Sequence, residues 1–175
     1  ELVQALPTSG YAILNADDER VRNMRNLTQA QVLTYGVHKS ADIRIIKCEL
    51  DEMARASVSA ATPWGTVSWA MSVPGAHMAL NAAAAIAVSG VCGVSIHSAA
   101  AALEQSVVSP MRMQVITTDD GMTIINDAYN ANPASMRAAL DTLVGMKASR
   151  HVVIAGQMAE LADSSAEHSA IVEYA

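Results

Sequence analysis

Basic side chains are scarce in this sequence. Lysine and arginine together number 11, against 17 aspartate and glutamate residues, and the formal net charge is −6. No basic cluster offsets this excess, so the chain lacks the electrostatic footprint of a nucleic-acid-binding protein. Charged residues make up only 16% of the chain, whereas apolar residues make up 51%. This balance supplies a sizeable hydrophobic core and argues against a disordered chain.

Cysteine is equally sparse. Cys48 and Cys92 lie far apart, without a CxxC spacing and without a nearby pair of histidines. This pattern argues against a structural zinc site and a disulfide framework and favours a reduced, cytoplasmic setting. The opening residues Glu1-Leu2-Val3 also lack the basic start and the cleavage site of a signal peptide. We therefore predict a cytoplasmic protein.

One long stretch has no charge at all. Residues 77–103 contain no Asp, Glu, Lys or Arg, which makes them the one segment that resembles a membrane span. The stretch consists mostly of alanine and is interrupted by Asn81, Gly90 and Gly93. Alanine drives membrane insertion poorly compared with leucine or isoleucine. A buried helix is therefore the favoured interpretation, and we predict no membrane span.

The apolar pattern along the chain predicts an α/β protein. We expect a strand, a surface helix, a strand, an antiparallel meander and two helices, at residues 11–15, 19–27, 32–35, 43–73, 76–89 and 95–105. After Pro110 we expect a strand–turn–strand unit, a helix, a strand and a last helix, at residues 111–125, 134–146 and 151–155 and from about 164. The second series is a Rossmann-like beginning. A boundary near 109–112 would divide the chain into domains at residues 1–110 and 111–175.

The richest polar segment follows the predicted strand–turn–strand unit. Residues 126–136 read NDAYNANPASM and lead from an apolar strand into a helix. Ligands of open α/β sheets bind at such strand ends, and helix N-termini attract anionic groups. Asp127 could accept hydrogen bonds from a ribose, and Asn130 and Asn132 could bind a polar ligand. The competing interpretation is an Asx-rich turn in which Asn132 or Ser135 caps the helix.

Two other segments contain candidate site residues. His77 and Asn81 are four positions apart, so they lie on one face of the predicted helix, where a side-chain amide can exchange two hydrogen bonds with an adenine edge. The alternative is that His77 caps the helix and Asn81 is a satisfied core amide. Arg112 lies at the predicted domain boundary, but a lone arginine in a strand is more often an ordinary surface residue.

These segments resemble the Mur ligase family. The run DAYNANPASM at 127–136 is similar to the family's D-x-Y-N-A-N-P-x-S-M signature, in the version found in ligases that add D-alanyl-D-alanine. Sister ligases and folylpolyglutamate synthases usually carry His- or Lys-containing loops at this point. PGAHMALNAAAA at 74–85 and SPMRMQ at 109–114 are similar to two further family patterns. The chain departs from them at Met78, where the family has Asn, and at Met111, where Gly is common.

Weaker similarity extends over most of the chain. The run ending in Asp17-Asp18 resembles the family's N-A-D-D strand end, although a solvated strand end is the simpler interpretation. IAGQMAEL at 154–161, followed by His168, resembles a stretch of the family's C-terminal domain. There Gln157 replaces an acid, while Glu160 and His168 keep their places. For His168 the alternative is a partly buried helix residue.

The resemblance implies a fold and a set of residue roles. The fold would be the second half of a Mur ligase central ATPase domain, followed by the start of a Rossmann-like C-terminal domain. Asp127 would contact the ribose of ATP, Asn81 the adenine and Arg112 the phosphates, with His77 beside them. The substrate cleft would contain Tyr129, Asn130 and Asn132.

The implied reaction is an ATP- and Mg²⁺-dependent amide ligation. It joins D-alanyl-D-alanine to UDP-N-acetylmuramoyl-tripeptide through an acyl phosphate, in peptidoglycan precursor synthesis. Two alternatives stay open: another amide ligase of the Mur or folylpolyglutamate type, and a catalytically silent nucleotide-binding module of the same fold.

The motif that cradles the phosphates of ATP is absent. The sequence has no G-x-x-x-x-G-K-[ST] loop. In the family this loop lies upstream, with the magnesium ligands and a carbamylated lysine, and Glu1-Leu2-Val3 resembles the stretch that follows that lysine. The chain also opens without Met and closes within a helical pattern at Ala175. We therefore expect an internal fragment that is inactive by itself.

Overall fold

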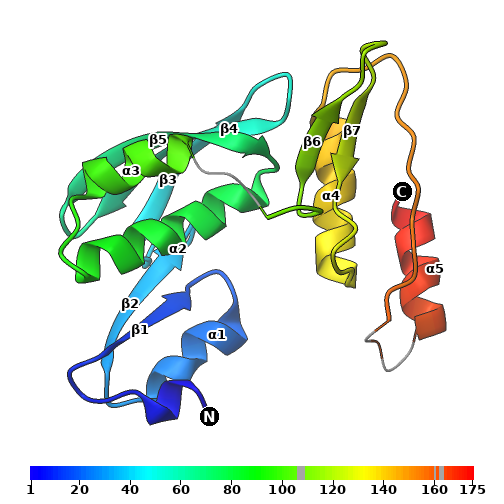
Figure 1. The fold of residues 1–175 in the computed structure, drawn as a ribbon. Coiled ribbons are helices and arrows are strands. Elements are labelled where there is room, and N and C mark those ends of the chain that lie inside the picture. The colour runs from blue at the N-terminus through cyan, green and yellow to red at the C-terminus, as the bar shows by residue number, and fades with distance from the viewer. Residues whose placement is uncertain (106–108, 160, 162–163) are drawn as a thin grey trace.

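The computed structural model describes residues 1–105, 109–159, 161 and 164–175, and these form two groups of elements that lie beside each other (Figure 1). The first group, up to residue 104, is built on a five-stranded sheet. The second group, from residue 114, combines a two-stranded sheet with two helices. The α/β class that we predicted is confirmed.

Parallel and antiparallel pairing are combined in the larger sheet. Its strands are β1 (Tyr11–Asn15), β2 (Gln31–Gly36), β3 (Ile43–Leu50), β4 (Arg55–Thr62) and β5 (Gly65–Pro74), and they lie in that order. β1, β2 and β3 pair in parallel, whereas β4 and β5 continue as an antiparallel meander. The predicted strands and meander are therefore confirmed.

Two helices cover one face of this sheet. Helix α2 (His77–Val91) packs on β2 and β3, and α3 (Ile96–Glu104) packs on β5. The meander buries alternate residues on this face because side chains of a strand point to opposite sides. Helix α2 buries a stripe at helical spacing: Ala79, Ala82, Ala83, Ile86 and Ala87. Small alanine side chains let the helix lie close to the sheet, as predicted for a buried helix.

The uncharged stretch is divided between these two helices. Helix α2 ends at Val91 and α3 begins at Ile96. No helix within the described part of the chain is both long and apolar enough to cross a membrane.

Short helices lie at the outer end of the sheet. The predicted surface helix over 19–27 is α1 (Glu19–Asn23), followed by a 3-10 turn, η2 (Met24–Leu27). Asp18 caps α1, because its carboxylate accepts the N–H groups of Arg20 and Val21 at 2.8 and 3.1 Å. Another 3-10 turn, η1 (Val3–Ala5), precedes β1.

The second group contains β6 (Gln114–Thr117), β7 (Thr123–Asn126), α4 (Pro133–Gly145) and α5 (Ser164–Tyr174). β6 and β7 form the predicted antiparallel hairpin. The two helices pack on each other around a small core formed by Leu140, Met158 and Ile171. The Tyr174 hydroxyl also donates a hydrogen bond to Asp141 Oδ1 at 2.6 Å.

The strand that we predicted over 151–155 is wrong. These residues form no ladder with any described strand, and Val152 and Ile154 are 60% and 96% exposed. The run HVVIA has the composition of a buried parallel strand, but such a strand forms only where a neighbouring strand pairs with its backbone. In the described residues that neighbour is missing.

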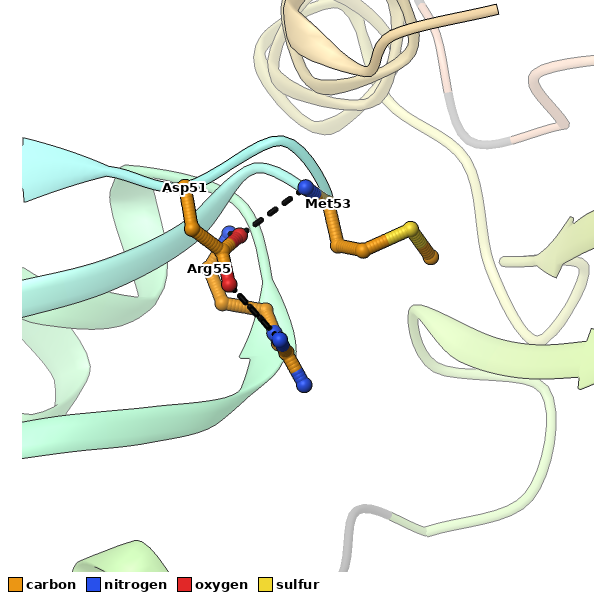
Figure 2. A network of polar contacts seen from close by, with 3 residues as sticks. All are labelled: Asp51, Met53 and Arg55. Carbon is orange, nitrogen blue, oxygen red and sulfur yellow. Dashed lines mark hydrogen bonds and ion pairs between the residues drawn. The ribbon is translucent and has the colours of Figure 1, made fainter.

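The turn between β3 and β4 approaches the second group. Asp51 shapes this turn: its Oδ1 accepts the backbone N–H of Met53 at 2.9 Å, and its Oδ2 accepts Nε–H of Arg55 at 2.8 Å (Figure 2). The turn is left-handed at Ala54, which has a φ of 55° and is fully buried. Asp51 therefore holds the turn in the shape in which it meets α4.

Two contacts join this turn to the end of α4. The backbone N–H of Lys147 donates to the Glu52 carbonyl at 3.0 Å. The two side chains form an ion pair at 2.9 Å, with 76% of each side chain exposed. A Cβ placed on Gly145 would lie 3.7 Å from the Cβ of Ala54, so the backbones approach closely. We call the contact between residues 52–54 and 145–147 the clasp.

Candidate functional site

A cavity of about 350 Å³ lies between the two groups of elements. One wall is the start of α2. The other is formed by residues 109–113, the segment before β6, and by residues 127–132, the loop after β7. All seven predicted site residues line it: His77, Asn81, Arg112, Asp127, Tyr129, Asn130 and Asn132. The structure thus brings together residues that are up to 55 positions apart, the separation of His77 from Asn132. A second hollow, of about 190 Å³ between α2 and α3, is mainly apolar.

Gly75 sets the position at which α2 enters the cavity. Its φ is +108°, and a Cβ there would lie 2.5 Å from Cε1 of His77 and 3.1 Å from Oγ1 of Thr142. Only glycine fits both this backbone conformation and this close approach. The turn allows β5 to pass directly into α2, so that the helix begins against the second group.

His77 is half-buried beside this turn. Burial lowers the pKa of its imidazole below the ordinary value of 6.5, and the negative charge of Asp127 opposes this shift in part. The N-cap residue of α2 is Ala76, without a side-chain capping bond, so the alternative in which His77 caps the helix is wrong. A neutral imidazole in the cavity can donate with one ring nitrogen and accept with the other.

Asn81 lies one helical turn further along the same face. It is exposed, so the alternative of a buried core amide is also wrong. Its Nδ2 donates a hydrogen bond to Sδ of Met78 at 3.6 Å. Met78, the departure from the family pattern, is therefore itself a cavity residue that contacts the amide.

Asp127 fastens the segment before β6 to the loop after β7. Its Oδ1 accepts the backbone N–H of Met113 at 2.9 Å. Met111 and Met113 have φ angles of 59° and 49°, which place both in the left-handed region that side chains other than glycine rarely adopt. Such a conformation persists where neighbouring contacts hold it. Asp127 is one of those contacts, and the Met113 N–H does not use its Oδ2.

Arg112 lies between these two methionines and stacks on Tyr129. Its guanidinium carbon is 4.1 Å from the centre of the tyrosine ring, within the range of a cation–π interaction. The backbone N–H of Tyr129 donates to the carbonyl of Met111 at 3.1 Å. Both contacts join the loop after β7 to the segment before β6.

Asn132 and Asn130 have local partners. Asn132 Oδ1 accepts the N–H of Ser135 at 2.9 Å, and the Ser135 hydroxyl oxygen accepts the N–H of Asn132 at 3.1 Å. This capping box starts α4, so the interpretation of a capping turn is confirmed for Asn132. Asn130 Oδ1 accepts the N–H of Ala131 at 2.9 Å. Both local bonds use the Oδ1 atom of the amide.

Asp17 and Asp18 lie outside the cavity and make local bonds. Asp17 accepts the N–H groups of Val37 and His38, at distances between 2.7 and 3.0 Å, and so joins the ends of β1 and β2. Asp18 is the cap of α1. A structural role therefore accounts for the two aspartates.

The weaker C-terminal match falls partly outside the described residues, because Glu160 is not among them. Gln157 is exposed. His168 is a half-buried residue of α5 whose Nε2 accepts the N–H of Met158 at 2.9 Å. It thus ties the segment before α5 to the helix.

The cavity also contains residues that the prediction did not include. They are Met78, Ser109, Met113 and Ser135. Met113 is 4% exposed, and its role rests on its backbone N–H, for which a sequence carries no side-chain signal. Ser109 and Ser135 flank predicted site residues, so their adjacency was the available signal.

The cavity combines charged and polar side chains of several kinds. It presents one carboxylate, one guanidinium, three side-chain amides and a neutral imidazole. This set can accept hydrogen bonds from hydroxyl groups, donate to a base edge and pair with an anion. In the described part of the chain, no group of three or more His, Cys, Asp or Glu side chains could hold a metal ion.

Comparisons with known proteins identify relatives over nearly the whole chain. Residues 1–89 match the model of the Mur ligase middle domain, and residues 111–175 match the model of the Mur ligase glutamate ligase domain. The chain is 42% identical to UDP-N-acetylmuramoyl-tripeptide--D-alanyl-D-alanine ligase of Mycobacterium tuberculosis (strain ATCC 25618 / H37Rv), over 98% of this chain and 35% of the relative. The chain thus spans about a third of the length of this curated relative.

Solved structures agree. The crystal structure of MurF from Acinetobacter baumannii superposes with a TM-score of 0.85 and 31% identity, over 95% of this chain and 36% of that protein. The MurF ligase from Thermotoga maritima, solved in complex with ADP, has a TM-score of 0.77. At 18% identity, over 99% of this chain and 39% of that protein, it shows the shared fold alone. By its two matched family models and its close relatives, the chain belongs to the Mur ligase family.

Proposed function

We propose that the full-length protein is an ATP-dependent amide ligase that joins D-alanyl-D-alanine to UDP-N-acetylmuramoyl-tripeptide. The observation that carries this proposal is the loop DAYNANPASM, which faces the start of α2 across one cavity. The name of the Mycobacterium tuberculosis relative, which is 42% identical, supports the choice of substrates. The reaction belongs to peptidoglycan precursor synthesis, which fits a cytoplasmic protein.

The cavity would bind ATP along its length. Asn81 would hydrogen-bond the adenine edge, with His77 beside it. Asp127, whose Oδ2 is not used by the Met113 N–H, would accept a ribose hydroxyl. Arg112 would lie at the phosphates. Tyr129, Asn130 and Asn132 would line the side of the cavity nearer the other substrates. The ADP complex of the Thermotoga maritima relative is consistent with a nucleotide site in this fold.

The proposed reaction has two steps. The γ-phosphoryl group of ATP passes to a carboxylate of the tripeptide, which gives an acyl phosphate and ADP. The free amine of D-alanyl-D-alanine then attacks the acyl carbon, and phosphate leaves as the amide bond forms. The described residues would bind and orient ATP for the first step.

Mg²⁺ belongs to the proposal for the whole protein. It would supply charge neutralisation at the phosphates. We assign it no ligand here, because the described residues contain no cluster of three or more suitable side chains.

We further propose that residues 1–110 and 111–175 belong to two domains that close on each other about the segment 109–112. The cavity lies at their junction, so closure would bring its two walls together around the nucleotide.

The test uses the complete protein. ADP release would be assayed with UDP-N-acetylmuramoyl-tripeptide, with and without D-alanyl-D-alanine. We expect sustained ADP release to require both substrates. Asp127→Ala and Asn81→Ala should each raise the KM for ATP about 10-fold, since each removes one or two hydrogen bonds of about 1 kcal/mol. Asp119→Ala, in the exposed turn between β6 and β7, is the matched control and should behave as wild type.

Three outcomes would count against parts of the proposal. Turnover with another amino acid or with folate, but not with D-alanyl-D-alanine, would replace the substrate assignment. No turnover by a folded full-length protein would favour the catalytically silent module. An Asp127→Ala variant with the wild-type KM for ATP would remove this residue from the nucleotide site.

A further inference from the structure

We infer that Tyr129 is a positioning residue for nucleotide binding, which acts through Arg112. Its ring holds the Arg112 guanidinium so that the N–H groups of the arginine face the phosphates of the nucleotide. This inference rests on the proposed function, and it gives Tyr129 a role other than contact with the acceptor substrate.

The first observation is the geometry of the pair. The guanidinium carbon of Arg112 lies 4.1 Å above the centre of the Tyr129 ring. A stacked guanidinium keeps its five N–H donors in its own plane, so that the flat face is covered while the edge stays free. The free edge of a guanidinium is the part that forms bidentate hydrogen bonds to phosphate.

The second observation is that Arg112 lacks an acidic partner in the described part of the chain. The ion pairs there join Lys47 to Glu49, Arg55 to Asp51 and Lys147 to Glu52. Aspartate is present in the same cavity, but Asp127 accepts a backbone N–H from Met113. The charge of Arg112 is thus available to an anionic ligand in the cavity.

The third observation is that the backbone fixes both members of the pair. The N–H of Tyr129 donates to the Met111 carbonyl, and the N–H of Met113 donates to Asp127. The residues on either side of Arg112 are therefore tied to the residues 127 and 129 of the loop. These bonds place the ring under the guanidinium. The arginine side chain is therefore already partly ordered, so it loses less conformational entropy when a ligand binds.

The exposure of Tyr129 fits this role. The residue is 59% exposed although it lines a cavity. Its ring adds little to the core of the second group, which is formed by Leu140, Met158 and Ile171. Substitution of the ring should therefore affect the cavity more than the stability of the fold.

The experiment compares two ligands that differ in their phosphates. Binding of ADP and of adenosine to the full-length protein would be measured by calorimetry. We expect Tyr129→Leu to weaken ADP binding about twofold to fivefold, the effect of an exposed cation–π contact, and to change adenosine binding less than twofold. Tyr129→Phe keeps the ring and should recover most of the lost ADP affinity.

The chain contains a matched control pair. Arg137 lies 5.2 Å from the ring centre of Tyr174 on the helices of the second group, outside the cavity. Tyr174→Leu removes a similar ring–arginine contact, and ADP should bind this variant as it binds wild type. In a double-mutant cycle, Tyr129→Leu should add little to the loss of ADP affinity caused by Arg112→Ala.

Several results would overturn the inference. One is an equal loss of ADP and adenosine affinity in Tyr129→Leu, because the ring would then contact the nucleoside itself. Another is additivity of the two substitutions in the cycle. A third is wild-type ADP affinity in Tyr129→Leu. If the Tyr129 variants bind ADP as predicted but the wild-type protein does not use D-alanyl-D-alanine, the proposed function is contradicted and the positioning role is still supported.

Discussion

His77 is the residue at which burial and a neighbouring charge oppose each other. Burial favours the neutral imidazole, whereas the charge of Asp127 across the cavity favours the imidazolium. The first effect is larger, so the pKa of His77 in the folded protein lies below 6.5. A histidine in this position responds to changes in the opposite wall of the cavity as well as to pH.

This balance predicts a pH dependence of stability with a definite sign. The unfolded chain takes up a proton on His77 as the pH falls below 6.5, while the folded chain resists it until a lower pH. Stability from this group is therefore fully present above 6.5 and is lost as the pH falls towards the folded pKa. Melting temperatures between pH 8 and pH 5 should fall more for wild type than for His77→Gln.

Titration of the His77 ring by NMR provides the direct measurement. The midpoint should lie below 6.5, and Asp127→Asn should lower it further because the opposing charge is removed. His97→Gln, on the exposed side of α3, is the matched substitution for the melting curves. A His77 midpoint at or above 6.5 would contradict the burial argument.

The site residues were predictable from sequence to different degrees. Asp127 and Asn132 lie between a strand and a helix that local patterns identify, and both line the cavity. The contact of Asp127 with the backbone of Met113 could not be predicted, because a backbone N–H has no residue type. The lowered pKa of His77 likewise could not be predicted from local sequence, because it depends on burial and on the charge of Asp127, 50 positions further along the chain.

At the scale of elements, α4 begins with a reciprocal cap. Asn132 and Ser135 exchange hydrogen bonds at 2.9 and 3.1 Å, and Pro133 occupies the first turn. We predict that Asn132→Ala lowers the free energy of unfolding by about 1 kcal/mol, the usual contribution of such a cap. Asn132→Asp should keep most of this stability, because its carboxylate accepts the same N–H near the positive end of the helix dipole.

Denaturant unfolding of the three proteins measures this effect. If Asn132 also binds a ligand through its free Nδ2 group, Asn132→Asp should weaken ATP binding while it preserves stability. Equal stability of Asn132→Ala and wild type would mean that the cap contributes nothing.

Elements defined by local pattern agreed with prediction, and one that depends on distant partners did not. The meander from β3 to β5 buries alternate residues, and α2 buries a helical stripe. The type of each element can therefore be predicted from its own sequence. Residues 151–155 have the apolar composition of a strand but no ladder partner among the described strands. Composition reports a preference for strand, whereas pairing requires a second segment that the run itself does not specify.

At the scale of the whole molecule, the cavity depends on how the two groups of elements are held together. Its two walls belong to different groups, and the segment before β6 is one connection between them. The clasp is another connection, at the C-terminal end of α4, opposite to its capped end. No sequence motif marked the clasp, because its backbone hydrogen bond and its close contact at Gly145 involve no distinctive side chains.

The clasp predicts a coupling between a surface ion pair and nucleotide affinity. Lys147→Glu places two like charges where the Lys147–Glu52 pair now lies at 2.9 Å, which pushes the turn away from α4. The pair is 76% exposed on both sides, so its contribution is at most about 1 kcal/mol. We therefore expect ADP affinity of the full-length protein to fall by no more than about fivefold at low salt.

The charge swap isolates the cause. The double variant Glu52→Lys/Lys147→Glu restores opposite charges and should recover the affinity, and 0.5 M salt should shrink the effect of the single variant because it screens exposed charges. Lys47→Glu, which disrupts another exposed pair, with Glu49 inside β3, should leave ADP affinity at the wild-type value. If Lys147→Glu and Lys47→Glu behave alike, the clasp does not control the cavity. The segment 109–112 and its contacts with the loop after β7 would then be sufficient to hold the two walls in place.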